Sequence, residues 1–191
     1  AMQKAVPVGV GAMAALLGVD LEPAQEIARE AAQGEVCACA NDNTPGQIVV
    51  SGHRATVERA IALSKEKGGK RGMLLPVSAP FHCALMQPAA DAMQEALAKV
   101  ALAPPVVPLV ANVTAAAVSD PETIRKLLVQ QVTAMVRWRE SVLYLKSVGV
   151  TTLVEVGAGK VLTGMNKRID RELASASVQS PAEVEAFLKT L

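Results

Sequence analysis

Aromatic residues are scarce in this 191-residue sequence, at 2% of the total. They are Phe81, Trp138, Tyr144 and Phe187. Proteins that bind single-stranded nucleic acid stack its bases on aromatic side chains, and four aromatic residues are too few for such a surface. No apolar run approaches the roughly 20 residues that a membrane-spanning helix needs. We therefore expect neither nucleic acid nor a membrane as a partner, and a core built from aliphatic side chains.

An excess of one charge is also lacking, and cysteine is rare. Nineteen Lys and Arg against 18 Asp and Glu leave a formal net charge of +1, so any charged partner must be recognised by a local cluster. Three cysteines, an odd number, fit reduced thiols better than a disulfide framework. The first residues lack the charged and apolar regions of a signal peptide. With 51% hydrophobic residues, the sequence predicts a globular, cytoplasmic protein.

Several motifs of catalysis and ligand binding are missing. The sequence has no Gly-x-Ser-x-Gly stretch, which forms the sharp turn that exposes a nucleophilic serine. Cys37 and Cys39 share one strand face without a second Cys or His pair nearby, so we expect no metal site and no cofactor. The turn Gly157-Ala158-Gly159-Lys160 fits neither the Walker loop nor the glycine spacing of Rossmann dinucleotide-binding loops. We interpret it as a tight strand-to-helix turn, with a phosphate site at the helix start as the alternative.

The hydrophobic pattern of residues 12–76 predicts six elements. Apolar runs indicate strands at 12–17, 36–40, 48–51 and 73–75, with turn-forming residues 41–46 between the middle two. Apolar stripes with helical spacing indicate helices near 20–34 and 54–67. The order strand, helix, strand, strand, helix, strand is typical of a ferredoxin-like (βαββαβ) subdomain, which we place at residues 10–78 after a connecting segment at 1–9.

Helices and strands alternate in residues 79–191. Helices are expected from Pro88, Pro121, near Trp138, after Gly159 and from Pro181, and strands at 106–111 and 152–156. Such alternation predicts α/β layers. The fold class is therefore α/β, with a ferredoxin-like subdomain preceding a second α/β part.

His82 is the residue best suited to general-base chemistry. It lies just before a predicted helix and just past the predicted subdomain junction, where clefts form. The alternative is a structural histidine with a satisfied hydrogen bond. We do not expect Cys83 to act as its nucleophilic partner, because sequence neighbours rarely point at one another and catalytic pairs are assembled from distant positions.

Seven collinear motifs closely resemble the malonyl-CoA:acyl carrier protein transacylase family. They are Ala1-Met2-Gln3, Gly11-Ala12-Met13-Ala14-Ala15, Asn41-Asp42-Asn43-Thr44-Pro45-Gly46-Gln47, Ser51-Gly52-His53, Ala79-Pro80-Phe81-His82-Cys83, Asn112-Val113-Thr114 and Glu155-Val156-Gly157-Ala158-Gly159-Lys160-Val161-Leu162-Thr163-Gly164. The resemblance implies that residues 79–191 are the C-terminal part of an α/β-hydrolase-like acyltransferase core. It also implies that the family's N-terminal part, with a Gly-His-Ser-x-Gly nucleophile, precedes Ala1 and is a partner of this chain, which alone would be inactive.

The resemblance implies a reaction and two catalytic residues. A serine would take malonyl from malonyl-CoA and pass it to the phosphopantetheine thiol of acyl carrier protein in type II fatty acid biosynthesis. His82 matches the base that removes the serine proton. Gln131 matches the residue whose main-chain oxygen orients this histidine, with Gln130 as the adjacent alternative. A non-enzymatic ferredoxin-like binding module and the acyltransferase piece of a polyketide synthase are the competing hypotheses.

The resemblance also implies binding residues. Phe81 matches the bulky ring that leaves no room for a 2-methyl group on malonyl, and Met2 and Asn112 match further substrate-binding positions. Because the family's carrier proteins are acidic, the basic residues Lys70, Arg71, Lys167 and Arg168 are candidates for carrier-protein docking. The alternative is that they are ordinary solvated charges near helix ends.

Overall fold

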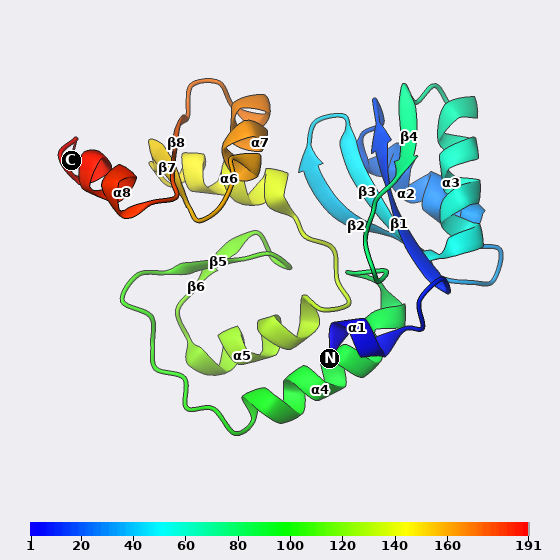
Figure 1. Cartoon of the computed structure of the whole chain (residues 1–191), viewed down its shortest axis with the longest axis horizontal. Coiled ribbons are helices and arrows are strands. Elements are labelled where there is room, and N and C mark those ends of the chain that lie inside the picture. Colours follow the sequence, from blue (N-terminus) through cyan, green and yellow to red (C-terminus); the bar gives the residue numbers. More distant parts are fainter. Residues whose placement is uncertain (191) are drawn as a thin grey trace. The chain divides into compact units, whose positions relative to one another are not determined.

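The computed structural model describes residues 1–190 (Figure 1). It divides into two compact units, Ala1–Ser141 and Val142–Leu191. None of the helices in residues 1–190 has the length and apolarity that crossing a bilayer requires. The subdomain limits 10–78 and 79–191 stay a prediction.

The first unit contains a four-stranded sheet with two helices. The elements are β1 (Gly11–Leu17), α2 (Leu21–Ala32), β2 (Cys37–Thr44), β3 (Gln47–His53), α3 (Arg54–Glu66) and β4 (Arg71–Leu74). The strand order is β2-β3-β1-β4, and every neighbouring pair is antiparallel. This arrangement confirms the predicted ferredoxin-like order of elements.

The two faces of this sheet bury different side chains. One face of β1 packs against the two helices. Its residues Ala12, Ala14 and Leu16 share a buried core with Ile27 of α2 and Val57 of α3. Met13 alternates with them and lies in a second cluster, which includes Phe81. Because successive strand residues point to opposite faces, one apolar run can pack against the helices and against the segment that carries His82.

A hairpin turn lies within the predicted residues 41–46, but the prediction was wrong for residues 41–44. β2 continues to Thr44, and only Pro45 and Gly46 connect it to β3. Register shifts on both sides of Asn41 and Asp42 mark bulges, and the Asp42 amide donates to the Val136 carbonyl at 2.9 Å. Asn and Asp disfavour strands when their side chains face water or their own backbone. Here the Val136 carbonyl and the Arg139 side chain, both distant in sequence, supply partners for the Asp42 amide and carboxylate.

The remaining elements of the first unit surround the candidate site. They are α1 (Met2–Ala5), the 3₁₀ turn η1 (Ala84–Met86), α4 (Gln87–Leu97), β5 (Leu109–Ala111), β6 (Ala116–Val118) and α5 (Pro121–Gln130). Val6, Ala79, Met86, Ala89 and Ala90 belong to the core that α1, η1 and α4 share with the end of α5. α1 lies within the segment predicted only as a connection. β5 is shorter than the predicted strand 106–111 because it begins after Pro108, which has no amide to donate.

The second unit is a parallel strand pair with helices. α6 (Trp138–Ser147) begins in the first unit and ends in the second, followed by β7 (Thr152–Val156), α7 (Val161–Ile169), β8 (Ala174–Val178) and α8 (Pro181–Leu188). β7 and β8 are parallel and α7 connects them. Ser180 and Glu183 form a reciprocal capping box at the start of α8. The predicted alternation is confirmed, but β8, with the sequence Ala-Ser-Ala-Ser-Val, carried too little hydrophobic signal to be predicted.

Candidate active site

His82 occupies an unusual backbone conformation that its neighbours hold in place. Its φ of +58° lies in the left-handed region, which few residues other than glycine adopt. On one side Pro80 packs so closely on Gly11 that a Cβ there would lie 2.3 Å from the proline Cγ. On the other side the buried Cys83 donates its thiol to the Pro80 carbonyl at 3.2 Å. Phe81 packs in two apolar clusters, so the histidine backbone is fixed from both directions.

The structure brings His82 and Gln131 together. His82 Nδ1 lies 2.9 Å from the Gln131 carbonyl oxygen. A carbonyl can only accept, so the proton is on Nδ1 and the Nε2 lone pair is left free to take a proton. Gln130, the alternative, instead directs its carbonyl to the amides of Thr133 and Ala134.

Gln131 has a free carbonyl because of its place in α5. It is the C-cap residue of this helix, and its own amide donates to Leu127. The last carbonyls of a helix have no partner within the helix, so one of them is available to the histidine. The Gln131 side chain is also held, since its Oε1 accepts a hydrogen bond from Asn112 Nδ2 at 3.2 Å. Asn112 directly follows β5.

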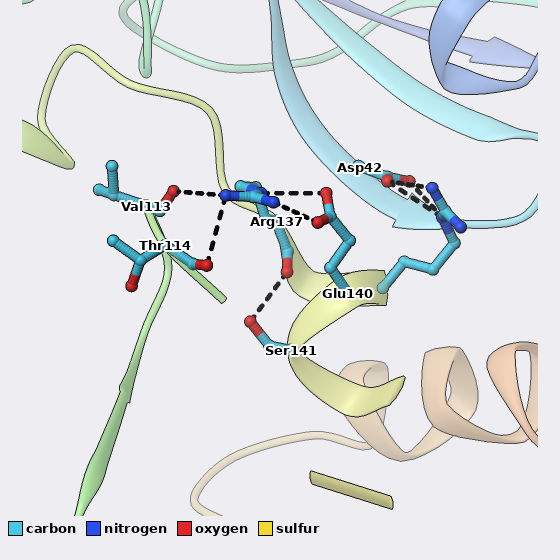
Figure 2. Close-up of polar contacts among 7 residues, drawn as sticks. Asp42, Val113, Thr114, Arg137, Glu140 and Ser141 are labelled. Carbon is cyan, nitrogen blue, oxygen red and sulfur yellow. Dashed lines mark hydrogen bonds and ion pairs between the residues drawn. The ribbon is translucent and has the colours of Figure 1, made fainter. Parts of the chain in front are cut away.

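Sequence reasoning missed the arginine that fixes this segment (Figure 2). The Arg137 amide donates to the Asn112 carbonyl at 3.0 Å, and its Nη1 donates to the carbonyls of Val113 at 3.2 Å and Thr114 at 3.3 Å. The guanidinium also forms a two-point ion pair with Glu140. Hydrogen bonding to Arg137 lowers the pKa of Glu140, so this carboxylate stays ionised beside the arginine.

A second arginine at the start of α6 reaches the four-stranded sheet. Arg139 Nε lies 3.1 Å and 3.0 Å from the two carboxylate oxygens of Asp42, and its Nη2 lies 2.8 Å from Oδ2. The Asp42 side chain is 0% exposed and that of Arg139 is 29% exposed. The hydrogen bonds to Asp42 raise the pKa of Arg139. The spacing Arg137-x-Arg139-Glu140 at a predicted helix start was the only available signal for both ion pairs.

The predicted substrate-binding residues lie on elements around His82. Phe81 is half-buried beside it, and Asn112 reaches it through Gln131. Met2 is 44% exposed on α1, a helix that packs against η1 and α4. Met2 therefore belongs to an element in contact with the turn that follows His82.

The cysteines are protected thiols. Burial raises the pKa of Cys83 and Cys37, and it raises the pKa of Cys39 to about 12. A thiol that stays protonated is a poor nucleophile. Within residues 1–190, no group of three or more His, Cys, Asp or Glu side chains is arranged to hold a metal ion.

The candidate docking residues are all exposed. Lys70 and Arg71 lie at the start of β4, and Lys167 and Arg168 lie in the last turn of α7. In the part of the chain that the structure describes, none of the four forms an ion pair. Their charges are therefore free to meet a partner.

The glycine turn before α7 is filled by a side chain of the chain itself. Glu155 accepts hydrogen bonds from the amides of Leu162 at 3.1 Å and Thr163 at 2.8 Å. These hydrogen bonds lower the pKa of Glu155, and the bond from the Thr163 amide has the largest effect. A carboxylate thus occupies the helix start where a phosphate would bind, which favours the interpretation as a structural turn.

Comparison with known proteins gives a consistent family. The sequence model of the Acyl transferase domain matches residues 1–186. A malonyl CoA-acyl carrier protein transacylase from Escherichia coli K12 is 46% identical over 188 residues, covering 98% of this chain and 61% of the relative. The relative from Bacillus subtilis is 41% identical over 191 residues and is covered to 60% of its length. The chain thus spans about three fifths of the length of the curated relatives it matches.

Solved structures give the same result. The crystal structure of an acyl-carrier-protein-S-malonyltransferase from Bartonella henselae is 52% identical with a TM-score of 0.95, covering 99% of this chain and 60% of that one. A malonyl-transacylase in complex with a type II PKS acyl-carrier protein is 42% identical with a TM-score of 0.95, covering 100% of this chain and 62% of that one. Because the family match extends over nearly the whole sequence and the backbone agrees with these structures, this chain belongs to the acyl transferase domain family.

Proposed function

We propose that this chain is the histidine-bearing part of a cytoplasmic malonyl-CoA:acyl carrier protein transacylase of type II fatty acid biosynthesis, whose serine nucleophile lies outside residues 1–191. The observation that carries the proposal is the hydrogen bond of 2.9 Å between His82 Nδ1 and the Gln131 carbonyl. It leaves Nε2 as a base of fixed orientation. Two further observations support the serine's location: the sequence has no Gly-x-Ser-x-Gly stretch, and the chain spans 61% of the Escherichia coli relative.

In the proposed mechanism His82 moves one proton in each half-reaction. Its Nε2 takes the serine hydroxyl proton as the serine oxygen attacks the malonyl thioester carbonyl, and then gives the proton to the departing CoA sulfur. In the second half-reaction His82 takes the proton of the phosphopantetheine thiol, the sulfur attacks the malonyl ester, and the proton returns to the serine oxygen. The Gln131 carbonyl stabilises the imidazolium formed in both steps.

A second candidate carrier comes from one comparison. The malonyl-transacylase found in complex with a type II PKS acyl-carrier protein is 42% identical to this chain. This favours, as an alternative, the acyltransferase of a polyketide synthase with the same chemistry. Transfer assays with a fatty acid synthesis carrier protein and with a type II polyketide carrier protein distinguish the two by their KM values.

Competition between two acyl-CoA substrates tests the proposed reaction. The full-length protein is mixed with equal malonyl-CoA and methylmalonyl-CoA and with holo acyl carrier protein. We expect malonyl transfer to predominate, because the Phe81 ring beside His82 excludes a methyl group, a discrimination worth about 1 to 3 kcal/mol. The variant Phe81→Ser should bring the two rates together. Absence of any transfer would contradict the function, whereas equal transfer by the unchanged protein would contradict only the role of Phe81.

We propose further that Lys70, Arg71, Lys167 and Arg168 dock the carrier protein. All four are exposed and lack ion-pair partners among the described residues. Lys167 and Arg168 also lie where cations stabilise a helix C-terminus, so docking is a second role for them. Charges at the rim of an interface mainly steer encounter and are screened by salt.

Charge reversal tests the docking proposal. Replacing the four residues by Glu in the full-length protein should raise the KM for carrier protein, more at low ionic strength than at high ionic strength. Transfer to free pantetheine should be almost unchanged. The control Lys99→Glu/Lys126→Glu reverses two exposed lysines outside the proposed docking residues. It matches in charge either docking pair taken alone, Lys70→Glu/Arg71→Glu or Lys167→Glu/Arg168→Glu. An unchanged KM for carrier protein at low salt would place the docking surface elsewhere.

A further inference from the structure

Asn112 uses both its side chain and its backbone to join three segments of the candidate site. Its Nδ2 donates to Gln131 Oε1 at 3.2 Å, and its carbonyl accepts the Arg137 amide at 3.0 Å. Gln131 in turn accepts the His82 Nδ1 proton with its main-chain oxygen. Hydrogen bonds therefore link Arg137 to Asn112, Asn112 to the Gln131 side chain, and the Gln131 main chain to the proposed base.

The turn that carries Asn112 is held rigidly. The Ala115 amide donates to the Ala111 carbonyl at 2.8 Å, and Ala115 adopts a φ of +51°. Figure 2 shows the Val113 and Thr114 carbonyls directed at the Arg137 guanidinium. A planar guanidinium with several donors in fixed directions can hold two carbonyls and a carboxylate at once. The Asn112 side chain thus projects from a turn whose backbone is already fixed.

We propose that Asn112 is a positioning residue for His82. It fixes the end of α5 at which the Gln131 carbonyl receives the Nδ1 proton, and Arg137 holds Asn112 in place. The inference rests on the proposed function, since it concerns the same base. It assigns Asn112 a role different from the substrate contact predicted from the sequence, because the Asn112 amide is directed at Gln131.

The physical reason is that an α-helix is least constrained in its last turn. The Gln131 backbone amide donates a hydrogen bond to the Leu127 carbonyl. The hydrogen bond from Asn112 to the Gln131 side chain is a further restraint on this residue, whose main-chain carbonyl faces His82. When this carbonyl moves away, the imidazole proton can transfer to Nε2. That tautomer has its lone pair on Nδ1, so it cannot take the serine proton from the same position.

The test is a double-mutant cycle in the full-length protein with Asn112→Ala, Gln131→Met and both together. Gln131→Met keeps the main-chain carbonyl that faces His82 and replaces the side-chain amide, with its Oε1 acceptor, by an apolar chain of similar length. Each single variant should lower kcat by about 3- to 10-fold, the equivalent of one neutral hydrogen bond, with little change in the KM for malonyl-CoA. The double variant should be no worse than either single variant, because both remove the same bond. Gln130→Met, an exposed neighbour whose side chain makes no hydrogen bond among the described residues, is the matched control.

Nitrogen NMR of His82 supplies a readout that does not depend on transfer. The signal is assigned by its loss in His82→Ala. In the unchanged protein the neutral ring should carry its proton on Nδ1, and in Asn112→Ala and Gln131→Met a fraction should carry it on Nε2. A ring that keeps the Nδ1 proton in both variants would overturn the proposal, even in a protein that transfers no malonyl.

The kinetics can overturn the proposal separately. If Asn112 bound substrate, Asn112→Ala would raise the KM for malonyl-CoA, and its effect would multiply with that of Gln131→Met in the double variant. If the unchanged protein is inactive, the proposed function fails, while the NMR measurement still decides whether Asn112 positions His82.

Discussion

Replacing His82 by Ala in the full-length protein is expected to lower kcat for malonyl transfer by a factor of about 100 to 10,000. His82 is the one residue in this chain to which the proposed mechanism assigns proton transfer in both half-reactions. Its Nδ1 is bonded to the Gln131 carbonyl at 2.9 Å, so Nε2 is oriented without any help from substrate. The measurement is the rate of malonyl transfer to holo acyl carrier protein at saturating malonyl-CoA.

Cys83→Ala is the matched control for this prediction. Cys83 is adjacent in sequence, but its thiol is buried, donates to the Pro80 carbonyl at 3.2 Å, and has a pKa raised by burial. Loss of this thiol should change kcat little, because the packing of Pro80 on Gly11 and of Phe81 in its apolar clusters still holds the His82 backbone. A large fall in Cys83→Ala together with an active His82→Ala would assign the chemistry to the other neighbour and refute the mechanism.

The sequence was sufficient to predict the elements that have strong local signals. β1 is an uninterrupted apolar run, α2 and α3 have apolar stripes at helical spacing, and proline marks the start of α5 and α8. These signals depend on neighbouring residues, so they can be recognised without knowledge of the tertiary fold. They gave the order of strands and helices along the chain that is typical of a ferredoxin-like subdomain, and the structure confirms that order.

Features that depend on distant partners could not be predicted in this way. Asn41 and Asp42 indicated a turn by composition, yet they lie in β2. The segment around them pairs with Val136, and Arg139 satisfies the Asp42 carboxylate. Asp42 and Arg139 are 97 residues apart in sequence. β8 was missed because its alternating Ala and Ser carry little hydrophobic contrast.

The candidate site shows the same difference between motif and geometry. The resemblance to a known family pointed to His82 and Gln131, and the structure places them in contact. The left-handed backbone at His82 and the bond from Asn112 to Gln131 have no local signature. They arise where three separate segments meet, so only coordinates could reveal that Asn112 and Arg137 support the histidine.

Replacing Arg139 by Met is expected to lower the free energy of unfolding of the full-length protein by about 3 to 5 kcal/mol. The Asp42 carboxylate is 0% exposed, and its only side-chain partner among the described residues is Arg139. Removing the guanidinium therefore leaves a buried charge without a partner or access to water. Urea denaturation followed by circular dichroism measures the change.

Replacing Asp42 instead of Arg139 should lower the free energy of unfolding by less. This difference makes the prediction specific to a buried carboxylate. In Asp42→Asn the charge left behind is that of Arg139, whose side chain is 29% exposed and can reach water, so the expected loss is roughly 1 to 2 kcal/mol. The double variant Asp42→Asn/Arg139→Met should be more stable than Arg139→Met alone, because it contains no buried charge. Arg54→Met, which breaks an exposed ion pair with Glu58, serves as the matched control and should cost less than about 1 kcal/mol. Equal losses in Arg139→Met and Arg54→Met would show that the pair with Asp42 contributes no more than a surface ion pair.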